Sequence, residues 1–444
     1  MENVIEELLK KNKFKEIKEH LIKLEDVDIA ELIEHTDKEN IIKLYSLLPK
    51  DLAAKTFSYL DKVHQHEIIN ELSDTDTAAI IEKMSADDAA DVFEELPANV
   101  VLKILKKTNK EKREQINKLL HYPADSAGSI MTVEFMEIRG NLKIREVIDI
   151  IRSEAKRKET IDLCFILDNE RTLLGTISLK EILLSDYEDN IYDVMKRTHK
   201  YVHTNTDQEA VAQKMQKYDL TVIPVVDSEK RMVGIITIDD IVDIIEHETT
   251  EDIEKMAAIR PTDKPYMEMS VFEIWKKRIP WLLLLMVSAT FTSKIIQGYE
   301  NALTKVAILT SFIPMFMDTA GNAGGQTSVT IIRALSLNDI KFSDIFKIMF
   351  KEFRVSILVG IALAIANFGK LLLIDHVSLN ITFVVCVTLI ITIIFAKLIG
   401  CILPMGAKKL GFDPAVMASP FITTIVDAIS LIVYFQVATI ILGL

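Results

Sequence analysis

Long apolar stretches in the last third of the chain constrain its fold more than any other feature. A helix that crosses a bilayer needs about 20 mostly apolar residues, and the sequence after Lys277 supplies several such stretches. Pro314 and Pro404 are expected to mark kinks or helix ends. The sequence therefore predicts a membrane region with five spans. They are roughly Ile279–Gln297, Val306–Ile332, Val355–Ile374, Val377–Leu403 and Pro414–Leu444.

Lysine and arginine residues beside these stretches predict the orientation in the membrane. Cytoplasmic loops carry an excess of such residues. One set precedes the first span, a second lies between spans two and three, and a third lies between spans four and five, whereas the loops near 299–304 and 375–380 carry little positive charge. We therefore expect a multi-pass plasma-membrane protein with a cytoplasmic N-terminal part and an extracytoplasmic C-terminus. The three sets are Lys276, Lys277 and Arg278; Arg333, Lys341, Lys347, Lys351 and Arg354; and Lys408 and Lys409.

Charge divides the chain at the same place as hydropathy. The 444 residues carry 52 Lys and Arg against 65 Asp and Glu, and the excess of acid lies wholly in the first 272 residues. An acidic soluble part argues against nucleic acid as a partner. It suits a cation ligand, although an acidic surface that only aids solubility remains an alternative.

Several classes of function find no support in the sequence. Cys164, Cys386 and Cys401 are scattered without metal-ligand spacing and are expected to be packing residues. There is no P-loop, nucleophile elbow or metal-hydrolase motif, so we do not expect an enzyme. The charged, amphipathic first residues are not expected to form a signal peptide.

The first 120 residues predict short amphipathic helices stacked from repeats. A pattern of a Ser or Pro turn, acidic residues, two alanines and an apolar face recurs from Leu47, Glu71 and Lys83. Serines at these turns suit helix N-caps, and acidic residues in a first turn favour the helix dipole. We expect a small helical superhelix, for which a plain docking scaffold is the alternative function.

Two units of short strands and helices that can be overlaid on each other follow from Met131. CFILDNERTLLGTISLKEIL, from Cys164, aligns with TVIPVVDSEKRMVGIITIDDIV, from Thr221, and a helix precedes each. This half resembles a tandem cystathionine-β-synthase (CBS) pair, a regulatory module that binds nucleotides or ions. The resemblance implies that Glu181 and Asp240 stand where a nucleotide-binding pair holds a ribose. ATP is therefore a possible modulator, and a dimerising spacer is the alternative.

An acidic helix after the second unit leads toward the membrane. Glu248, Glu251, Asp252 and Glu254 crowd it, and like charges three or four residues apart repel each other. A divalent cation would relieve this repulsion, and Mg²⁺ suits such a place because a few carboxylates hold it while it keeps its waters. The carboxylates expected to share Mg²⁺ with this helix are Asp87, Asp88, Asp91, Asp207, Glu209, Asp219 and Asp240.

The last span carries a carboxylate that cannot easily reach water. Ionisable residues in a span are expensive and mark functional sites. Asp427 lies on one predicted helix face with Ser419, Thr423, Ser430 and Tyr434. Such a polar stripe suits a cation pathway, and a homo-oligomer would bring copies of Asp427 together. A buried Asp bonded to a neighbouring helix is the alternative.

The second span carries a matching stripe. Asp318, Asn322 and Gln326 recur every four residues, beside Gly321 and further small residues that let helices approach closely. Close packing and pore lining both explain the glycines, and the amide side chains favour the pore. The lysines of the spans, Lys294, Lys370 and Lys397, are expected to reach the membrane surface and to matter little.

These motifs resemble the MgtE-type magnesium transporter and channel family over essentially the whole chain. The most specific matches are AGNAGGQTSVTIIRAL from Ala320 and DPAVMASPFITTIVDAISLIVYF from Asp413, with KYDLTV and TTEDIEKMAA in the soluble part. The resemblance implies that Asp427 is the pore aspartate. It also implies a homodimer with the pore at the subunit interface, which Mg²⁺ between the cytoplasmic domains holds shut. Ser419 and Gly325 depart from the family, where Asn can stand.

The expected fold is multi-domain: an α-helical superhelical N-domain, α/β tandem CBS domains and a five-helix transmembrane domain. The expected function is passive Mg²⁺ uptake gated by cytoplasmic Mg²⁺. A transporter for Mn²⁺ or Co²⁺ is one alternative, which the lack of a His/Cys cluster in the spans disfavours, and a membrane-anchored nucleotide sensor is another. The expected domains are 1–130 (helical), 131–195 and 196–250 (CBS), 251–275 (connecting helix) and 276–444 (membrane pore).

Overall fold

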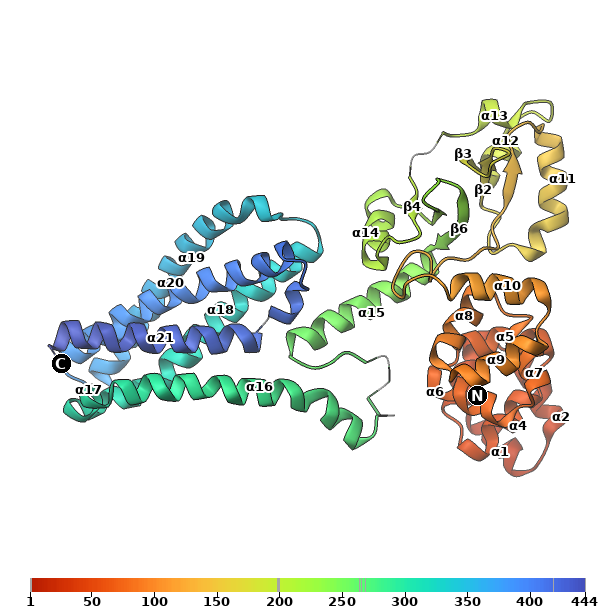
Figure 1. Cartoon of the computed structure of the whole chain (residues 1–444). Helices are drawn as coiled ribbons and strands as arrows, with labels where there is room; N and C mark the ends of the chain where they lie inside the picture. Colours follow the sequence, from red (N-terminus) through yellow and green to blue (C-terminus); the bar gives the residue numbers. More distant parts are fainter. Residues whose placement is uncertain are drawn as a thin grey trace. The chain divides into compact units, whose positions relative to one another are not determined.

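The computed structural model divides into two compact units, residues 1–245 and 246–444 (Figure 1). Each unit is described by itself, and helix α15 (Ile238–Met256) begins in the first and ends in the second. The structure describes residues 2–197, 200–262, 264, 266–267, 269–417 and 419–443.

The first unit begins with short helices that stack in sequence order (Figure 1). The expected serine caps are present: Ser73 and Ser85 accept hydrogen bonds from the backbone N–H groups of Asp76 and Asp88. Apolar faces of these helices form one continuous core that reaches into the second CBS-like unit. The helices are α1 (Glu2–Lys10), α2 (Phe14–Leu21), α3 (Asp26–Glu34), α4 (Lys38–Ser46), α5 (Lys50–Tyr59), α6 (Lys62–Glu71), α7 (Asp74–Ile81), α8 (Ala86–Glu95), α9 (Ala98–Lys107) and α10 (Lys110–Leu119).

Two small sheets of the same topology complete the first unit. In each, the first strand pairs parallel with the second, and the second pairs antiparallel with the third. The overlay of the two sequence units is therefore confirmed in three dimensions. The elements are β1 (Glu137–Arg139), α11 (Ile144–Glu154), β2 (Leu163–Leu167), β3 (Leu173–Ser178), α12 (Leu179–Leu184) and α13 (Ile191–Val194), then β4 (Val202–His203), α14 (Gln208–Tyr218), β5 (Val222–Val226) and β6 (Met232–Thr237).

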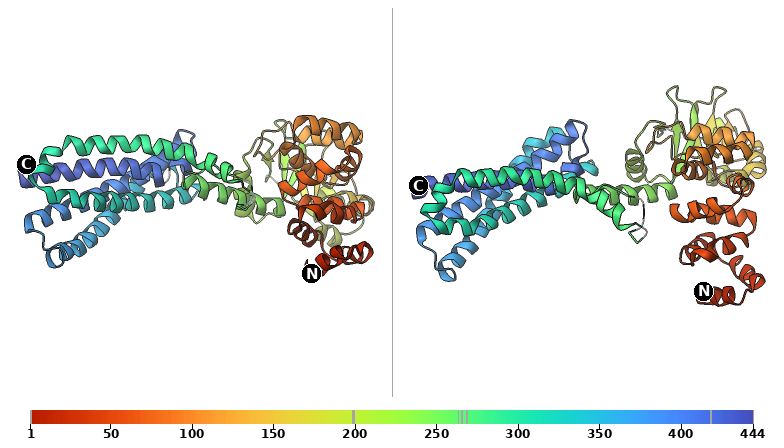
Figure 2. Two further views of the ribbon diagram at one scale, coloured as in Figure 1. Left: turned by 90° about the horizontal axis from the view of Figure 1, so that it is seen from below. Right: turned by 60° about the horizontal axis from the view of Figure 1, so that its bottom comes forward.

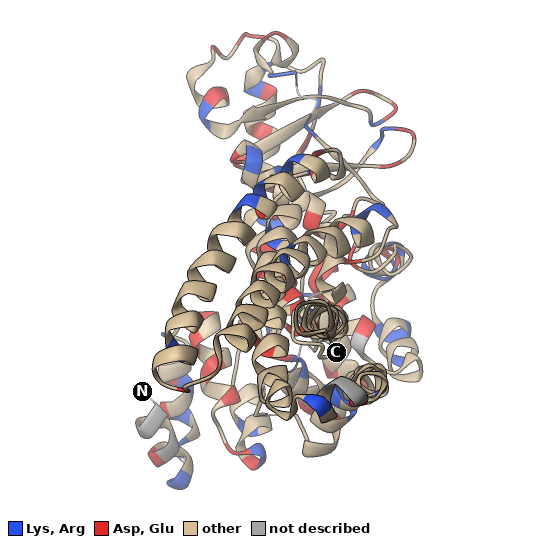
Figure 3. Cartoon of the chain, turned by 90° about the vertical axis from the view of Figure 1, so that its left-hand side faces the viewer, with Lys and Arg blue, Asp and Glu red and all other residues tan. Residues whose placement is uncertain are grey.

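The second unit is a bundle of long helices, whose ribbons carry few charged residues along most of their length (Figure 3). Short 3₁₀ segments, at Ala307–Phe312, Phe342–Asp344 and Pro414–Met417, precede three of them. The helices are α16 (Val271–Gly298), α17 (Glu300–Lys305), α18 (Ile313–Ser336), α19 (Ile345–Leu373), α20 (Leu379–Lys409) and α21 (Ser419–Leu442).

Helix α18 packs against both α20 and α21, α19 packs along α20, and α16 lies along α21 (Figure 2). Within the described ranges, four segments are long and apolar enough to cross a membrane: Val271–Gly298, Phe342–Leu373, Leu379–Lys409 and Pro414–Leu442. Helix α18, the second predicted span, is 24 residues long and carries the polar stripe predicted for it. It completes the bundle beside those four.

Pro314 and Pro404, which were expected to mark kinks or helix ends, have different positions in their helices. Pro314 stands in the first turn of α18, where a missing N–H is harmless. Pro404 lies inside α20, which continues to Lys409, so it does not end the helix, and the alternative of a kink at this proline stays a prediction. All three cysteines are free and buried, as expected for packing residues.

Candidate functional site

Asp427 lies where α21 meets α18. A Cβ atom added at Gly321 of α18 would lie 2.9 Å from Cγ2 of Thr423 and 3.7 Å from Oδ1 of Asp427. Glycine is therefore what permits α18 to approach Thr423 so closely, and Asp427 lies at van der Waals distance from the same point. The Oδ1 atom of Asp427 is buried and has no hydrogen-bond partner among the residues that the structure describes. An ionised oxygen in this state calls for a cation or water.

The polar residues of α18 lie on the outside of the bundle rather than in its core. Asp318, Asn322 and Gln326 are exposed, whereas Gly321, Gly324 and Gly325 between them are buried. Asn322 Nδ2 donates to Asp318 Oδ1 at 3.2 Å, so the stripe is ordered along the helix. In a membrane, such a surface needs water or another protein against it.

The predicted stripe on α21 is only partly correct. Tyr434 is fully buried, and its hydroxyl donates to the carbonyl oxygen of Leu309 at 2.8 Å. Ser430 is buried as well. These two side chains are core residues because α21 turns that part of its face toward the other helices. Thr423 and Asp427 remain half-buried, and the side chain of Ser419 lies outside the described residues.

The expectation that Lys397 reaches the membrane surface is wrong. Its residue is 6% exposed, and its Nζ lies 3.5 Å from Oε2 of Glu352 on α19 and 3.1 Å from Oγ1 of Thr327 on α18. Sequence reasoning missed Glu352 and Thr327, because only the packing of α19 and α18 on α20 brings them to Lys397. Lys370, by contrast, forms an exposed pair with Asp375 at 3.1 Å, and Lys294 is exposed.

In the first unit, four of the predicted sensing carboxylates come together. Asp87 and Asp91 lie on α8. Burial and the charge of Asp88 raise the pKa of Asp87 to about 8. Asp91 is exposed, but desolvation by the protein around it and the charge of Asp88 raise its pKa to about 7. Asp87 is 9% exposed, and its Oδ1 has no hydrogen-bond partner within the part of the chain that the structure describes. Asp240, at the start of α15, adds its negative charge to both.

Asp240 and a residue that the sequence did not suggest complete this cluster. Burial raises the pKa of Asp240 to about 6, against the effect of a 2.7 Å hydrogen bond from Thr237 Oγ1. Burial and the charges of Asp240, Asp239 and Asp88 also raise the pKa of Glu159. Glu159 follows α11 in a charged loop without a motif, so no pattern in the sequence marks it.

Three other predicted sensing residues lie at the two ends of α14 and make local contacts there. Asp207 caps this helix by accepting a hydrogen bond from the Glu209 N–H. Glu209 accepts a hydrogen bond from Gln213 Nε2 one turn later. Asp219 ends the helix in the left-handed conformation, with φ of 50°.

The acidic part of α15 is less exposed than the sequence predicts. Glu248, Glu251 and Asp252 are half-buried. Glu251 pairs with Lys255 at 2.7 Å, and the same lysine pairs with Asp413 at 2.7 Å, just before α21. Glu254 Oε2 accepts the Thr262 N–H at 2.9 Å. Fixed hydrogen bonds and a lysine therefore relieve part of the repulsion for which we expected a cation.

The two predicted nucleotide carboxylates are both engaged at helix starts. Glu181 accepts hydrogen bonds from the N–H and hydroxyl of Ser178 in a capping box and pairs with Lys196. These contacts lower its pKa. Two surface cavities of about 580 and 600 Å³ lie in the first unit, but neither Glu181 nor Asp240 lines them.

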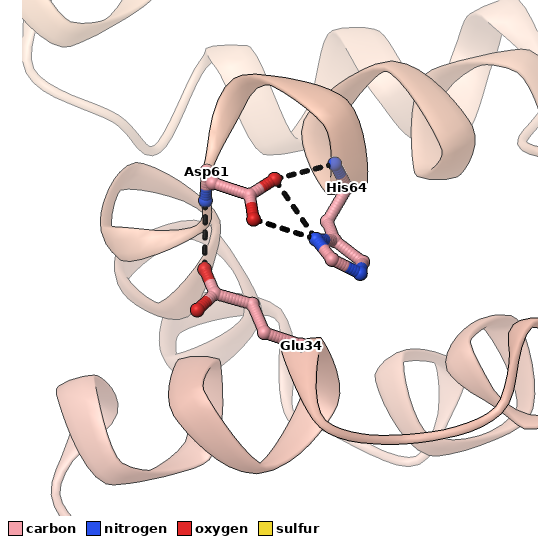
Figure 4. Close-up of side chains that lie close together, drawn as sticks. All are labelled: Glu34, Asp61 and His64. Carbon is pink, nitrogen blue, oxygen red and sulfur yellow. Dashed lines mark hydrogen bonds and ion pairs between the residues drawn. The ribbon is translucent and has the colours of Figure 1, made fainter. Parts of the chain in front are cut away.

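Glu34, Asp61 and His64 form a further group of close potential ligands, which the sequence did not suggest (Figure 4). The Asp61 N–H donates to Glu34 at 2.8 Å, and Asp61 caps α6 by accepting from the His64 N–H at 2.8 Å. The His64 ring lies 2.8 Å from the same carboxylate. Helix capping explains this group without a metal ion.

Comparison with known families identifies three parts of the chain. Residues 313–437 match the family described as a divalent cation transporter, MgtE. Residues 24–125 match the MgtE intracellular N domain, and residues 191–247 match the CBS domain.

Curated relatives extend over most of the chain. The magnesium transporter MgtE of Thermus thermophilus is 37% identical over 74% of this chain and 73% of its own length. The Enterococcus faecalis transporter of the same name is 34% identical over 74% and 72%.

Solved structures cover the soluble half. The cytosolic domain of the Mg²⁺ channel MgtE in complex with ATP is 31% identical, with a TM-score of 0.53, over 55% of this chain and all of that one. The soluble part of a magnesium transporter is 29% identical, with a TM-score of 0.52, over 56% and 97%.

Proposed function

The chain belongs to the MgtE family of magnesium transporters, which are not enzymes, and on that premise we propose that it conducts Mg²⁺ passively through a pathway beside Asp427. The observation that carries the proposal is the buried, unpartnered Oδ1 of Asp427 next to Gly321 and Thr423. Mg²⁺ loses its waters reluctantly. We therefore propose that the carboxylate holds a hydrated ion through those waters.

The proposed pathway lies between two copies of the chain. Asp318, Asn322 and Gln326 are exposed on the single bundle, which would be unfavourable against lipid. A second copy related by a two-fold axis would place the same stripe opposite and enclose a polar lumen. This geometry supports a homodimer in the lipid bilayer.

No energy source besides the membrane potential is needed for uptake. A potential of 100 mV, negative inside, contributes about 4.6 kcal/mol to a divalent cation, from roughly 2.3 per charge. The proposed orientation has the first unit in the cytoplasm, in line with its match to an intracellular domain, and the C-terminus outside.

We propose that cytoplasmic Mg²⁺ closes the pathway by binding the acidic cluster of Asp87, Asp88, Asp91 and Asp240. Asp87 is buried, Asp240 is half-buried, and the charge of Asp88 acts on Asp87, Asp91 and Asp240, so these carboxylates repel one another and their pKa values are raised. A divalent cation relieves this and thereby favours the conformation in which the carboxylates lie together. Glu248, Glu251 and Asp252 on α15 are proposed to carry the effect toward the membrane unit.

The function is tested with the full-length protein in liposomes. Mg²⁺ entry is measured for the wild type and Asp427→Asn, at low and at millimolar Mg²⁺ on the cytoplasmic face. Asp375→Asn, in the exposed pair with Lys370, serves as the control. Flux that requires Asp427 and falls with cytoplasmic Mg²⁺ supports both parts of the proposal. A folded wild type without Mg²⁺ flux under either condition would contradict conduction.

Selectivity is tested in the same liposomes. The ligands available beside Asp427 are carboxylate, hydroxyl and amide oxygens, which favour Mg²⁺ over softer ions. Mn²⁺ or Co²⁺ entering faster than Mg²⁺ at equal concentration would favour the other divalent transporters instead.

ATP binding by the CBS pair is a second candidate function. It is favoured by the likeness of the first unit to a cytosolic domain solved with ATP. Glu181 accepts hydrogen bonds from Ser178 and Asp240 accepts one from Thr237, but Glu181 also pairs with Lys196. We therefore propose that Asp240 is the more available of the two carboxylates. Calorimetry of the full-length protein with ATP, compared with Asp240→Ala, tests this, and equal affinity in both would exclude that role for Asp240.

A further inference from the structure

A charged pair lies inside the membrane unit at a point where three helices meet. Lys397 of α20 and Glu352 of α19 are 3.5 Å apart, with side chains 8% and 18% exposed. A lone charge as buried as this would be expensive, so each residue depends on the other. No motif of the pathway includes them.

Thr327 of α18 joins the two charges through one hydroxyl. Lys397 Nζ donates to its Oγ1 at 3.1 Å, and the same Oγ1 donates to Oε2 of Glu352 at 3.2 Å. The hydroxyl thus both accepts from the cation and donates to the anion, so its direction is determined. Both bonds are made in the rotation that α18 has in this structure.

The contact lies one turn from a very close helix crossing. A Cβ atom added at Gly400 of α20 would lie 2.5 Å from the carbonyl oxygen of Gly324 and 3.2 Å from Cβ of Thr327. Gly400 follows Lys397 by three residues, and Gly324 precedes Thr327 by three. The glycines at the crossing therefore permit the short distance between α18 and α20, and the hydrogen bonds of Thr327 lie one turn away from it.

The opposite face of α18 carries the pathway stripe. Gln326 directly precedes Thr327 and is exposed, whereas Ser328, directly after it, is fully buried. Successive residues differ by about 100° around a helix. A modest rotation of α18 would therefore turn Gln326 and Asn322 away from the exposed face of the bundle on which both lie.

We propose that Lys397 is a positioning residue for the ion pathway: with Glu352 and Thr327 it holds α18 in the rotation that presents Asn322 and Gln326 to the passing ion. This inference rests on the proposed function. Buried ion pairs often add little stability compared with apolar residues but can specify one arrangement, and such a role suits a helix that must present a polar face in a membrane.

The first test measures the rotation of α18 directly and does not require transport. The three native cysteines of the full-length protein are first replaced, and a single cysteine is then introduced as Gln326→Cys in one variant and as Ser328→Cys in another. The rate at which a water-soluble thiol reagent modifies each cysteine is measured. We expect Thr327→Val, which leaves no new charge unpaired, to slow labelling at 326 and speed labelling at 328 by about threefold or more, since loss of one hydrogen bond is worth about 1 kcal/mol. Unchanged rates at both positions would overturn the proposal.

The second test measures transport and separates positioning from folding. Lys397→Met and Glu352→Gln are each expected to lower the maximal Mg²⁺ flux about tenfold or more, because each leaves a buried charge unpaired. The swapped variant, with Lys397→Glu and Glu352→Lys, should recover flux to within about threefold of wild type. Lys370→Met with Asp375→Asn is the matched control, because that pair is exposed, and it should conduct as wild type.

The outcomes separate the two proposals. If wild type conducts and Asp427→Asn does not, the proposed pathway stands. In that case a Thr327→Val variant that conducts as well as wild type would overturn only the positioning role of Lys397 and Glu352. If wild type does not conduct, the function fails, and the labelling rates still decide whether the pair holds α18. The melting temperature of Thr327→Val is measured as well. If its loss of flux is no larger than its loss of stability explains, the positioning role would also be overturned.

Discussion

Lys255 Nζ lies 2.7 Å from Oδ2 of Asp413 and 2.7 Å from Oε1 of Glu251. One ammonium group therefore joins the end of α15 to the turn that leads into α21, the helix that carries Asp427. The three side chains are partly exposed, between 22% and 34%. In the gating that we propose, these two ion pairs are a direct charged contact through which α15 would act on α21.

Replacing Lys255 by Met should weaken inhibition by cytoplasmic Mg²⁺. A partly exposed pair is worth about 1 kcal/mol or less, so we expect the half-inhibitory concentration to rise by about fivefold at most. Flux into liposomes at a series of cytoplasmic Mg²⁺ concentrations measures it. Lys347→Met, whose lysine forms an exposed pair with Asp344, is the control, and equal curves for both variants would contradict the prediction.

Mg²⁺ binding at the α8 cluster should strengthen as pH rises from about 6 to about 8.5, because protons compete for Asp87 and Asp91, whose pKa values are about 8 and 7. These values lie above those of an unfolded chain, so without Mg²⁺ the carboxyls stabilise this region at low pH and lose that effect as pH passes 7 to 8. Hydrogen exchange of α8 in the full-length protein, with and without Mg²⁺, measures both effects.

The double variant Asp87→Asn with Asp91→Asn is the control for that experiment. Its amides imitate the protonated carboxyls, so α8 should stay protected at pH 8.5 without Mg²⁺ and should respond little to the ion. A pH-dependent response to Mg²⁺ equal to that of wild type would show that other groups bind it.

Alanine at Gly400 should disrupt the crossing of α18 and α20. The added Cβ would lie 2.5 Å from the Gly324 carbonyl oxygen, and overpacking of this kind costs about 1–3 kcal/mol. Gly406→Ala on the same helix is the matched control, since its Cβ would meet nothing within 4 Å. Thermal unfolding in detergent, followed by size-exclusion chromatography, should show a lower midpoint for the Gly400 variant alone.

Phenylalanine at Tyr434 should lower stability without lowering flux. The hydroxyl is buried and donates to the Leu309 carbonyl, and losing such a bond costs about 1 kcal/mol. Thr423→Val, beside Gly321, should instead lower Mg²⁺ flux with little effect on melting. If Tyr434→Phe loses more Mg²⁺ flux than Thr423→Val does, Tyr434 would have to line the pathway after all, and this prediction would be wrong.

Local patterns in the sequence determined much of this protein. Ser73 and Ser85 predicted their helix caps, the two aligned units predicted two sheets of one topology, and apolar length predicted the membrane helices. These features depend on residues close together in the chain, where helical and strand periodicity leave a readable trace. The exposed stripe on α18 follows the predicted spacing for the same reason, and the role of Asp427 in the pathway stays a prediction.

Only the tertiary structure decided which distant residues meet. Lys397 has the same sequence surroundings as a lysine that reaches the surface, but it lies against Glu352 and Thr327, which are 45 and 70 residues away. Tyr434 continues the spacing of Asp427 but points into the core, and Glu159 joins the α8 cluster from a loop. Periodicity gives the face on which a side chain lies, whereas the neighbours of that face, and so the partner of each buried charge, come from how the helices pack.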